Sequence, residues 1–167
     1  MQIQMAKPED SDSILQLYLQ FNEDRVKSGV GDAHYKTLDG ELPWKRTLSD
    51  GDCLSLIAKE KGGRIFGFIT LRVPQFNPFN KVGKLAEVDL IVVDQRLSRK
   101  HIGTVLYEAA VSRMKDIGVT HILLNVKIGN VPAMVFWTKL GFKKVSKTDY
   151  KRADGVEEQT MYMLKKI

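Results

Sequence analysis

The spacing of apolar residues predicts a strand and then a helix at the start of the chain. Residues 2–6 alternate between polar and apolar side chains, as in a strand with one buried face. Residues 8–11 are of the types that begin helices, and apolar residues then recur three and four positions apart over residues 14–21. This buried stripe ends near Asn22. Weak periodicity and several glycines predict a loop over residues 24–40.

The middle of the chain reads as an antiparallel hairpin followed by another strand. A brief helix over residues 42–48 is expected before it. Residues 54–59 and 65–73 are apolar-rich runs separated by the turn sequence Glu-Lys-Gly-Gly at positions 60–63. Residues 85–93 form a third apolar-rich run, which we predict to be the next strand.

The rest of the chain alternates between helix and strand. The pattern predicts an amphipathic helix over residues 102–117, a strand over 122–126, a second helix, and strands over 142–145 and 160–164. Gly118 and Gly141 follow the two helices as stop signals. Asn130 is a suitable cap for the second helix. Pro132 falls in the first turn, where a helix has no hydrogen bond to lose.

Composition places the chain among ordinary globular proteins. It has 167 residues, of which 43% are hydrophobic and 28% charged, so a single domain over residues 1–167 is expected to fold around its own core. No apolar run approaches the roughly 20 residues that cross a bilayer, so no membrane partner is expected. The N-terminus lacks an export signal, which makes the cytoplasm the expected location.

Charge and the scarcity of metal ligands narrow the function classes further. The net charge of +6 suits a nucleic-acid binder, yet the basic residues are spread along the chain without a nucleic-acid-binding motif. We therefore expect no nucleic-acid partner; a phosphate-bearing cofactor would explain part of the positive surplus equally well. The lone Cys53 and the separated His34, His101 and His121 predict no metal site.

Residues 92–106 carry the clearest chemical signal. A strand feeds a short basic turn that contains Arg99 and Lys100, and the turn opens into a helix at Ile102. Unpaired N–H groups at a helix N-terminus, the positive end of the helix dipole and two cations together suit a pyrophosphate. A plain solvated strand–helix turn is the alternative that this segment alone leaves open.

Two segments in this order resemble the Gcn5-related N-acetyltransferases. The second, Asn-Val-Pro-Ala-Met-Val-Phe-Trp-Thr-Lys-Leu-Gly-Phe at positions 130–142, matches a family motif of Asn-x-x-Ala, an aromatic pair and a terminal Gly-Phe. The first matches the family's Gln/Arg-x-x-Gly-x-Gly/Ala only at Gly103. Ser98 stands at the Gln/Arg position, and His101 stands at the first glycine.

The resemblance implies a fold and a cosubstrate. The fold is α/β, with a mixed, mostly antiparallel central sheet that splays at the cofactor cleft and about four flanking helices. The cosubstrate is acetyl-CoA. The cofactor-binding residues implied are Ile91, Val92, Val93, Ser98, Arg99, Lys100, His101, Ile102, Gly103, Thr104, Asn130, Ala133 and Trp137.

The strand over residues 85–93 would, by the same resemblance, admit the pantetheine arm. The Ile91 N–H would polarise the thioester carbonyl, and Val93 would bond a pantetheine amide. Strict alternation along the strand places Glu87, Asp89 and Ile91 on one face, which makes this acidic face the candidate cleft. Glu87 is the proposed general base and Asp89 the reserve; a solvent-facing or lysine-paired carboxylate is the alternative for Glu87.

Trp137 departs from the family at a position of chemical interest. Many relatives carry a tyrosine in the aromatic pair that protonates the departing thiolate, and an indole N–H cannot do so at neutral pH. Tyr150 and Tyr162 are the candidate substitutes.

The predicted reaction is direct transfer of the acetyl group of acetyl-CoA to a primary amine of a small molecule in a ternary complex. Acetylation of a protein, on lysine or on an N-terminal amine, is the alternative enzyme function. A module that binds acyl-CoA without turnover is the alternative outside enzymes. Acceptor specificity is expected in residues 24–40, 74–80 and 150–157. A homodimer stays open as the oligomeric state.

Overall fold

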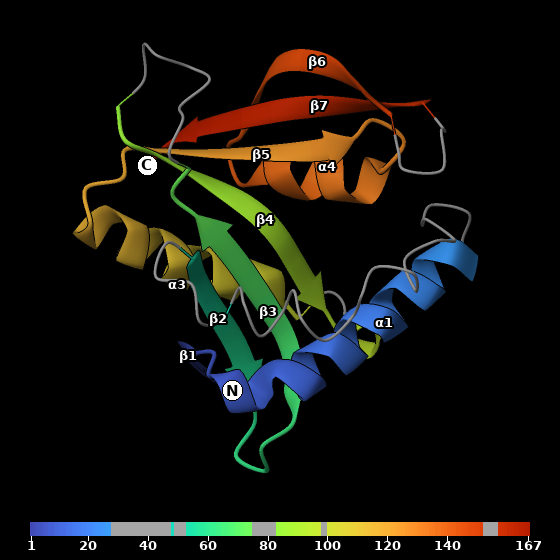
Figure 1. Cartoon of the computed structure of the whole chain (residues 1–167), viewed down its shortest axis with the longest axis vertical. Coiled ribbons are helices and arrows are strands. Elements are labelled where there is room, and N and C mark those ends of the chain that lie inside the picture. Colours follow the sequence, from blue (N-terminus) through green and yellow to red (C-terminus); the bar gives the residue numbers. More distant parts are fainter. Residues whose placement is uncertain (28–47, 49–52, 75–82, 98–99, 152–156) are drawn as a thin grey trace.

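The computed structural model describes residues 1–27, 48, 53–74, 83–97, 100–151 and 157–167. Within these ranges the chain forms one seven-stranded sheet with helices on both faces (Figure 1). The strands are β1 (Gln2–Met5), β2 (Cys53–Lys59), β3 (Ile65–Arg72), β4 (Leu85–Val93), β5 (His121–Lys127), β6 (Lys143–Lys151) and β7 (Glu157–Lys166).

The strands lie in the order β1-β2-β3-β4-β5-β7-β6. Every neighbouring pair is antiparallel except β4 and β5, which are parallel and are joined through the helix between them. The predicted α/β class, the hairpin of β2 and β3 and the mostly antiparallel sheet are confirmed.

Three α-helices and two short 3-10 helices are present in the described ranges. They are α1 (Ser11–Lys27), α3 (Ile102–Asp116), α4 (Val131–Lys139), η1 (Pro8–Asp10) and η3 (Gln95–Leu97). The helix predicted over residues 42–48 lies outside the described residues apart from Leu48, which is helical. The loop predicted over residues 24–40 is wrong at its start, because α1 continues to Lys27.

The two faces of the sheet carry separate cores. On the α1 face, Ile14 and Leu17 pack with Phe68 and Val92. On the α3 face, a larger cluster joins α3 and α4 to strands on both sides of the β4–β5 pair, and Leu106 of α3 is fully buried within it. We use the terms α1 face and α3 face in this sense below.

Glycine stops end both helices on the α3 face, as the sequence predicts. Gly118 and Gly141 have positive φ angles of 80° and 88°, a conformation that costs glycine little. After α4, the Gly141 N–H donates to the Thr138 carbonyl at 2.9 Å and the Phe142 N–H donates to the Trp137 carbonyl at 3.1 Å. This pair of bonds is a Schellman motif, and it turns the chain directly from α4 into β6.

The sheet splays where β4 and β5 diverge. Strand β4 pairs with β3 along most of its length, but its ladder with β5 covers only Leu85–Val88. Figure 1 shows the two strands separating towards their C-terminal ends, with α1 and α4 on either side of the opening. The splay implied by the family resemblance is therefore present.

A β-bulge sits where the splay begins. Thr70 of β3 lies opposite Leu90, whereas its neighbour Leu71 lies opposite Val88, so β4 holds one extra residue, Asp89. A bulge of this kind reverses the face towards which the following side chains point.

The strict alternation predicted for β4 is consequently wrong. It placed Glu87 and Ile91 on the same face, but Ile91 packs with Ala86 and Val88 on the α3 face. Val92 packs on the α1 face. Because Glu87 alternates with Ala86 and Val88 before the bulge, its side chain lies on the α1 face, opposite to that of Ile91.

Candidate active site

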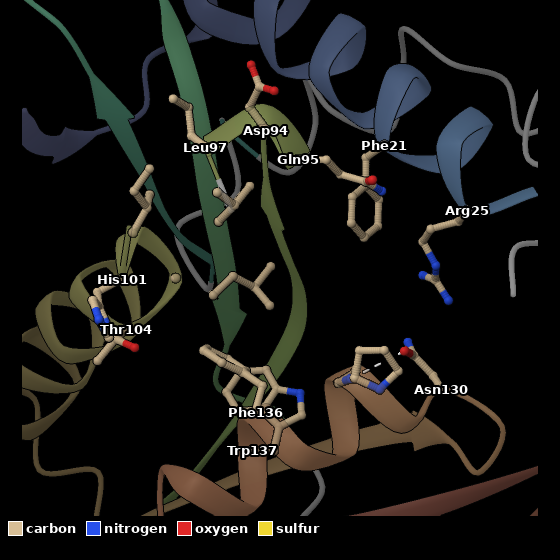
Figure 2. A pocket seen from close by; sticks show the side chains of 16 residues that line it. Phe21, Arg25, Asp94, Gln95, Leu97, His101, Thr104, Asn130, Phe136 and Trp137 are labelled. Atoms are coloured by element: carbon tan, nitrogen blue, oxygen red, sulfur yellow. Dashed lines mark hydrogen bonds between the residues drawn. The ribbon is translucent and has the colours of Figure 1, made fainter. Parts of the chain in front are cut away.

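A cavity of about 610 Å³ occupies the opening between β4 and β5. Most of the predicted cofactor residues line it, namely Ile91, Val93, His101, Ile102, Gly103, Thr104, Asn130, Ala133 and Trp137. Its walls come from α3 and α4 on one face of the sheet and from Phe21 and Arg25 of α1 on the other (Figure 2). The cavity therefore joins the two faces of the sheet.

The N-terminus of α3 forms one end of this cavity. The first intrahelical hydrogen bond runs from the Val105 N–H to the His101 carbonyl at 3.0 Å, so the N–H groups of Ile102, Gly103 and Thr104 have no acceptor within the helix. All three of these residues line the cavity. The positive end of the helix dipole adds to their attraction for an anion.

His101 adopts the conformation for which the family motif uses glycine. Its φ and ψ are 58° and 14°, and it is the only non-glycine residue with positive φ among those described. Histidine tolerates this left-handed region better than β-branched residues do, at a cost of about 1 kcal/mol. The turn thus keeps the glycine-like backbone path in spite of the substitution.

Gly103 lets α3 approach α4 closely. A Cβ atom built on Gly103 would lie 3.3 Å from the Phe136 ring, tighter than ordinary contact. Glycine at this position therefore lets the helix start and the aromatic ring share one wall of the cavity.

The backbone of β4 faces the opening at two residues. The Asp94 N–H donates to the Phe66 carbonyl of β3 at 2.8 Å. In an antiparallel pair, the backbone N–H and C=O groups of every second residue point towards the partner strand, so those of Asp94 and Val92 face β3. The N–H and C=O groups of Ile91 and Val93 consequently point away from β3, into the opening. Among the described strands none pairs with them there, because the β5 ladder ends at Val88.

The α4 wall combines a helix cap with packed aromatic rings. The Asn130 side chain accepts a hydrogen bond from the Ala133 N–H at 3.3 Å, which confirms the predicted cap. Trp137 is 5% exposed, and its ring centroid lies 5.8 Å from that of Tyr107 and 5.2 Å from that of Phe142. Packing holds Trp137 in place, so its ring forms a fixed apolar boundary of the cavity.

Asp94 fixes the turn that leads from β4 towards α3, a role that the sequence analysis missed. Its side chain is 3% exposed and accepts hydrogen bonds from Arg64 at 2.6 Å and Arg96 at 2.7 Å. Arg96 also donates from Nε at 2.9 Å, and its backbone N–H adds a fourth donor at 3.0 Å. These bonds, with Arg96 the largest contributor, lower the pKa of Asp94 to about 2. An Asp followed two positions later by Arg at a strand end is the only signal the sequence offers.

Phe21 and Arg25 were also missed as cavity residues. Both line the cavity from α1, and the Arg25 guanidinium carbon lies 5.3 Å from the centroid of the Phe21 ring. Leu17, Phe21 and Arg25 follow one another at four-residue spacing, so they share one face of the helix. That spacing could have revealed Arg25 had a loop not been expected from residue 24 onwards.

The predicted acid–base residues lie beside the cavity rather than in its lining. One oxygen of Asp89 accepts a hydrogen bond from Arg72 Nε at 2.7 Å and forms an ion pair with a terminal nitrogen of the same guanidinium at 2.6 Å. Burial raises the pKa of Asp89, and the hydrogen bond from Arg72 offsets part of this rise. Burial, followed by the charge of Asp89, raises the pKa of Glu87, and Arg72 offsets this in part. The Arg72 guanidinium therefore pairs with Asp89 and acts on Glu87 through its charge alone.

The remaining predicted residues are placed as follows. The Val92 side chain is buried against the α1 core and does not line the cavity, and Lys100 is exposed beside it. Ser98 and Arg99 lie outside the described residues. Tyr150 belongs to β6, but its side chain is not described.

Two classes of feature are not found in the described ranges. No three His, Cys, Asp or Glu side chains there come together in a way that could hold a metal ion. No helix of those ranges has the length and apolar character needed to cross a bilayer.

Known proteins resemble the chain in sequence and in fold. An N-alpha-acetyltransferase from Sulfurisphaera tokodaii is 30% identical over 107 residues, 61% of this chain and 64% of that protein. A mycothiol acetyltransferase from Saccharomonospora viridis is 31% identical over 59% of this chain and 32% of its own length. The chain thus spans less than two thirds of either relative.

A solved structure agrees over nearly the whole fold. The PaiA N-acetyltransferase from Thermoplasma acidophilum, in complex with coenzyme A, superposes with a TM-score of 0.73 at 21% identity and covers 99% of this chain and 98% of its own. The sequence profile of the acetyltransferase (GNAT) family matches residues 12–142. With the splayed sheet, the α3 turn and the capped α4 in the positions described, this chain belongs to the GNAT acetyltransferase family.

Proposed function

We propose that the protein is an acetyl-CoA-dependent N-acetyltransferase that acts on a primary amine. The observation that carries this proposal is the cavity that joins both faces of the sheet at the splay, with a helix N-terminus at one end. A cofactor that enters on the α3 face can present its thioester there to an amine that arrives from the α1 face.

Acetyl-CoA fits this cavity in one direction. Its pyrophosphate would accept hydrogen bonds from the N–H groups of Ile102, Gly103 and Thr104, with Lys100 and Arg99 nearby in sequence. The pantetheine arm would then run along β4, where the backbone of Val93 can pair with an amide. The Ile91 N–H would polarise the thioester carbonyl as negative charge develops on its oxygen.

The amine would be activated by Glu87. An alkylammonium group with a pKa near 10.4 must lose a proton before it attacks, which costs about 4–5 kcal/mol at pH 7. Glu87 lies on the α1 face, and its raised pKa makes it a stronger base than an ordinary carboxylate. We favour it over Asp89, because the ion pair with Arg72 holds that carboxylate.

The reaction would then run as a direct transfer. The amine nitrogen attacks the thioester carbon, its proton passes to Glu87 directly or through water, and the carbon–sulfur bond breaks. Trp137 cannot protonate the thiolate. Because thiols of this kind have a pKa of about 8.5, we expect water to supply that proton after the thiolate departs.

The acceptor is proposed to be a small primary amine. An N-terminal amine of a polypeptide is the second candidate, and it is favoured by the similarity to a relative named N-alpha-acetyltransferase. Both acceptors present the same reacting group, so the chemistry above serves either.

The test is to incubate the protein with acetyl-CoA and a panel of small amines and N-terminal peptides, and to measure CoA release and acetylated product. We expect product to form and Gly103→Val to weaken acetyl-CoA binding in calorimetry, because the larger side chain displaces Phe136 and crowds the helix start. Unchanged binding by a folded Gly103→Val variant would refute the cofactor placement. Acetyl-CoA binding without turnover of any amine would instead support a non-catalytic sensor.

A further inference from the structure

The register of β3 and β4 places a cation directly opposite the proposed base. Arg72, the last residue of β3, and Glu87 of β4 are Cα partners in the antiparallel ladder. Phe68 packs on the α1 face, so alternation along β3 puts the Arg72 side chain on that face too, with Glu87. Directly opposed side chains of opposite charge are within reach of each other in an antiparallel pair. The register alone would therefore favour an ion pair between Arg72 and Glu87.

The structure pairs Arg72 with the bulge residue instead. A single oxygen of Asp89 lies 2.7 Å from Arg72 Nε and 2.6 Å from a terminal nitrogen of the same guanidinium. The half-buried Glu87 has no hydrogen bond or ion pair among the described residues. Asp89 is the extra residue that β4 holds at the bulge. The guanidinium thus passes over the carboxylate opposite it and binds the one two positions further along β4.

The partner that Arg72 takes decides how basic Glu87 is. Burial and then the charge of Asp89 raise the pKa of Glu87, and the charge of Arg72 lowers it. A direct ion pair with a guanidinium would lower the pKa of a carboxyl group further, by about one to three. A carboxylate with a lower pKa takes a proton from an amine less readily. Asp89 therefore keeps Glu87 basic in two ways, through its own charge and by occupying the guanidinium.

Other titratable side chains share the α1 face around β4. They are His121 and Lys127 of β5, Glu158, Tyr162 and Lys166 of β7, and Asp24 and Arg25 in the last turns of α1. Leu123 of β5 stands opposite Glu87 on that side and carries no charge. Among the described residues, the charges that shift the pKa of Glu87 are those of Asp89 and Arg72. The pair that these two residues form therefore sets the charge balance at Glu87.

We propose that Asp89 is a positioning residue: it holds the Arg72 guanidinium away from Glu87 and so leaves the Glu87 carboxylate ready to accept a proton. The proposal rests on the proposed function for the role of Glu87 as the base. When Asp89 no longer holds Arg72, the guanidinium moves to Glu87, its partner across the two strands.

Two NMR measurements on the whole protein test this proposal without turnover. The first is the pKa of Glu87, followed at its carboxyl carbon in protein that carries isotope-labelled glutamate, with Glu87→Gln to assign the signal. Asp89→Asn should lower this pKa by about one to three, and adding Arg72→Met should restore it. The second is the Arg72 Nε–H signal. Glu87→Gln should leave that signal unchanged in the wild type and shift it in the Asp89→Asn background, where the guanidinium pairs with Glu87.

Control variants separate this contact from a general change of charge. Asp89→Glu keeps the carboxylate and should keep the wild-type result in both measurements. Glu23→Gln removes one negative charge from an exposed side chain of α1 that pairs with Lys27 at 3.3 Å, and should change neither measurement. Circular dichroism verifies that each variant is folded, and Asp89→Ser replaces Asp89→Asn if the latter does not fold.

The proposal is overturned if the pKa of Glu87 does not fall in Asp89→Asn. It is also overturned if the pKa falls while the Arg72 Nε–H signal stays indifferent to Glu87→Gln, because the loss of charge alone would then explain the fall.

Acetyl transfer is measured in parallel. Asp89→Asn should slow it about threefold to thirtyfold at pH 7, as Brønsted behaviour predicts for a weaker base, and adding Arg72→Met should restore most of the rate. Both NMR results without any transfer would refute the proposed function and leave the pairing of Arg72 standing. Transfer without either NMR result would overturn this inference and leave the proposed function standing.

Discussion

Replacing Asp94 with Asn should reveal how much the β4 turn contributes to stability. The buried carboxylate accepts hydrogen bonds from two guanidinium groups and one backbone N–H, which hold its pKa at about 2 instead of 3.8. At about 1.4 kcal/mol for each pKa unit, ionised Asp94 stabilises the folded state by about 2 kcal/mol at pH 7.

The sign of the pH dependence follows from the lowered pKa. The contribution of a carboxylate with a depressed pKa is fully present above its unfolded pKa of 3.8 and is lost as the pH falls towards 2. Urea unfolding at pH 7 should therefore show Asp94→Asn to be about 2 kcal/mol less stable than the wild type. At pH 3 about half of that difference should remain.

Asp149→Asn provides the matched control. It also removes one carboxylate, but from an exposed position whose partner among the described residues is the neutral Gln159. Its effect should stay below about 0.5 kcal/mol at both pH values. An Asp94→Asn variant as stable as the wild type at pH 7, or a difference that does not shrink between pH 7 and pH 3, would refute this account of the turn.

Three further substitutions test the site. Glu87→Gln should lower the acetylation rate about 10²–10⁴-fold with little change in acetyl-CoA affinity. The wild-type rate should fall with decreasing pH at a pKa above that of an ordinary glutamate, and a full rate for the variant across pH 6 to 9 would exclude Glu87 as the base. His101→Gly should raise the free energy of unfolding by about 0.5–1 kcal/mol in a urea titration, whereas Gly118→Ala, at a positive φ with open space around it, should lower it. Trp137→Phe should cost about 1–3 kcal/mol of stability in thermal or urea unfolding and keep most of the activity. Loss of more than about 10²-fold in rate by the folded Tyr150→Phe or Tyr162→Phe variant would instead indicate that a tyrosine protonates the thiolate.

Elements marked by local chemistry were predictable from the sequence. Strand β4 has the predicted bounds, and α3 ends one residue before the prediction, because Gly118 stops it. The Asn130 cap and the Gly141 stop likewise depend on neighbours within a few residues. Such signals are local, so they can be read without knowledge of the fold.

The end of α1 was not predictable from its apolar stripe. Residues beyond Asn22 are mostly charged, and Glu23 pairs with Lys27 at 3.3 Å one turn later. Such residues are good helix formers and stabilise an exposed turn, but they carry no apolar periodicity. The stripe therefore marked only the buried part of the helix, and Arg25 fell outside it.

The bulge at Asp89 could not be read from β4 alone. A bulge is a property of two strands, because it exists only where the register against β3 shifts between Thr70 and Leu71. In the sequence of β4 alone, a single extra residue leaves a pattern that still reads as the regular alternation of a strand. Nine of the residues predicted to bind the cofactor line one cavity, whereas Glu87 and Ile91, predicted on one face, lie on opposite faces.

The position of this bulge accounts for the layout of the proposed site. Asp89 follows Val88, the last residue of β4 paired with β5, so the reversal of faces coincides with the start of the splay. Before it, β4 sends a carboxylate to the α1 face; after it, the strand sends Ile91 to the cavity and its backbone groups to the opening. A regular strand would place Glu87 and the Ile91 side chain on one face, where the proposed base and the cofactor would compete for the same space. The bulge separates them, so an amine held near Glu87 can approach a thioester polarised at Ile91 from the opposite side.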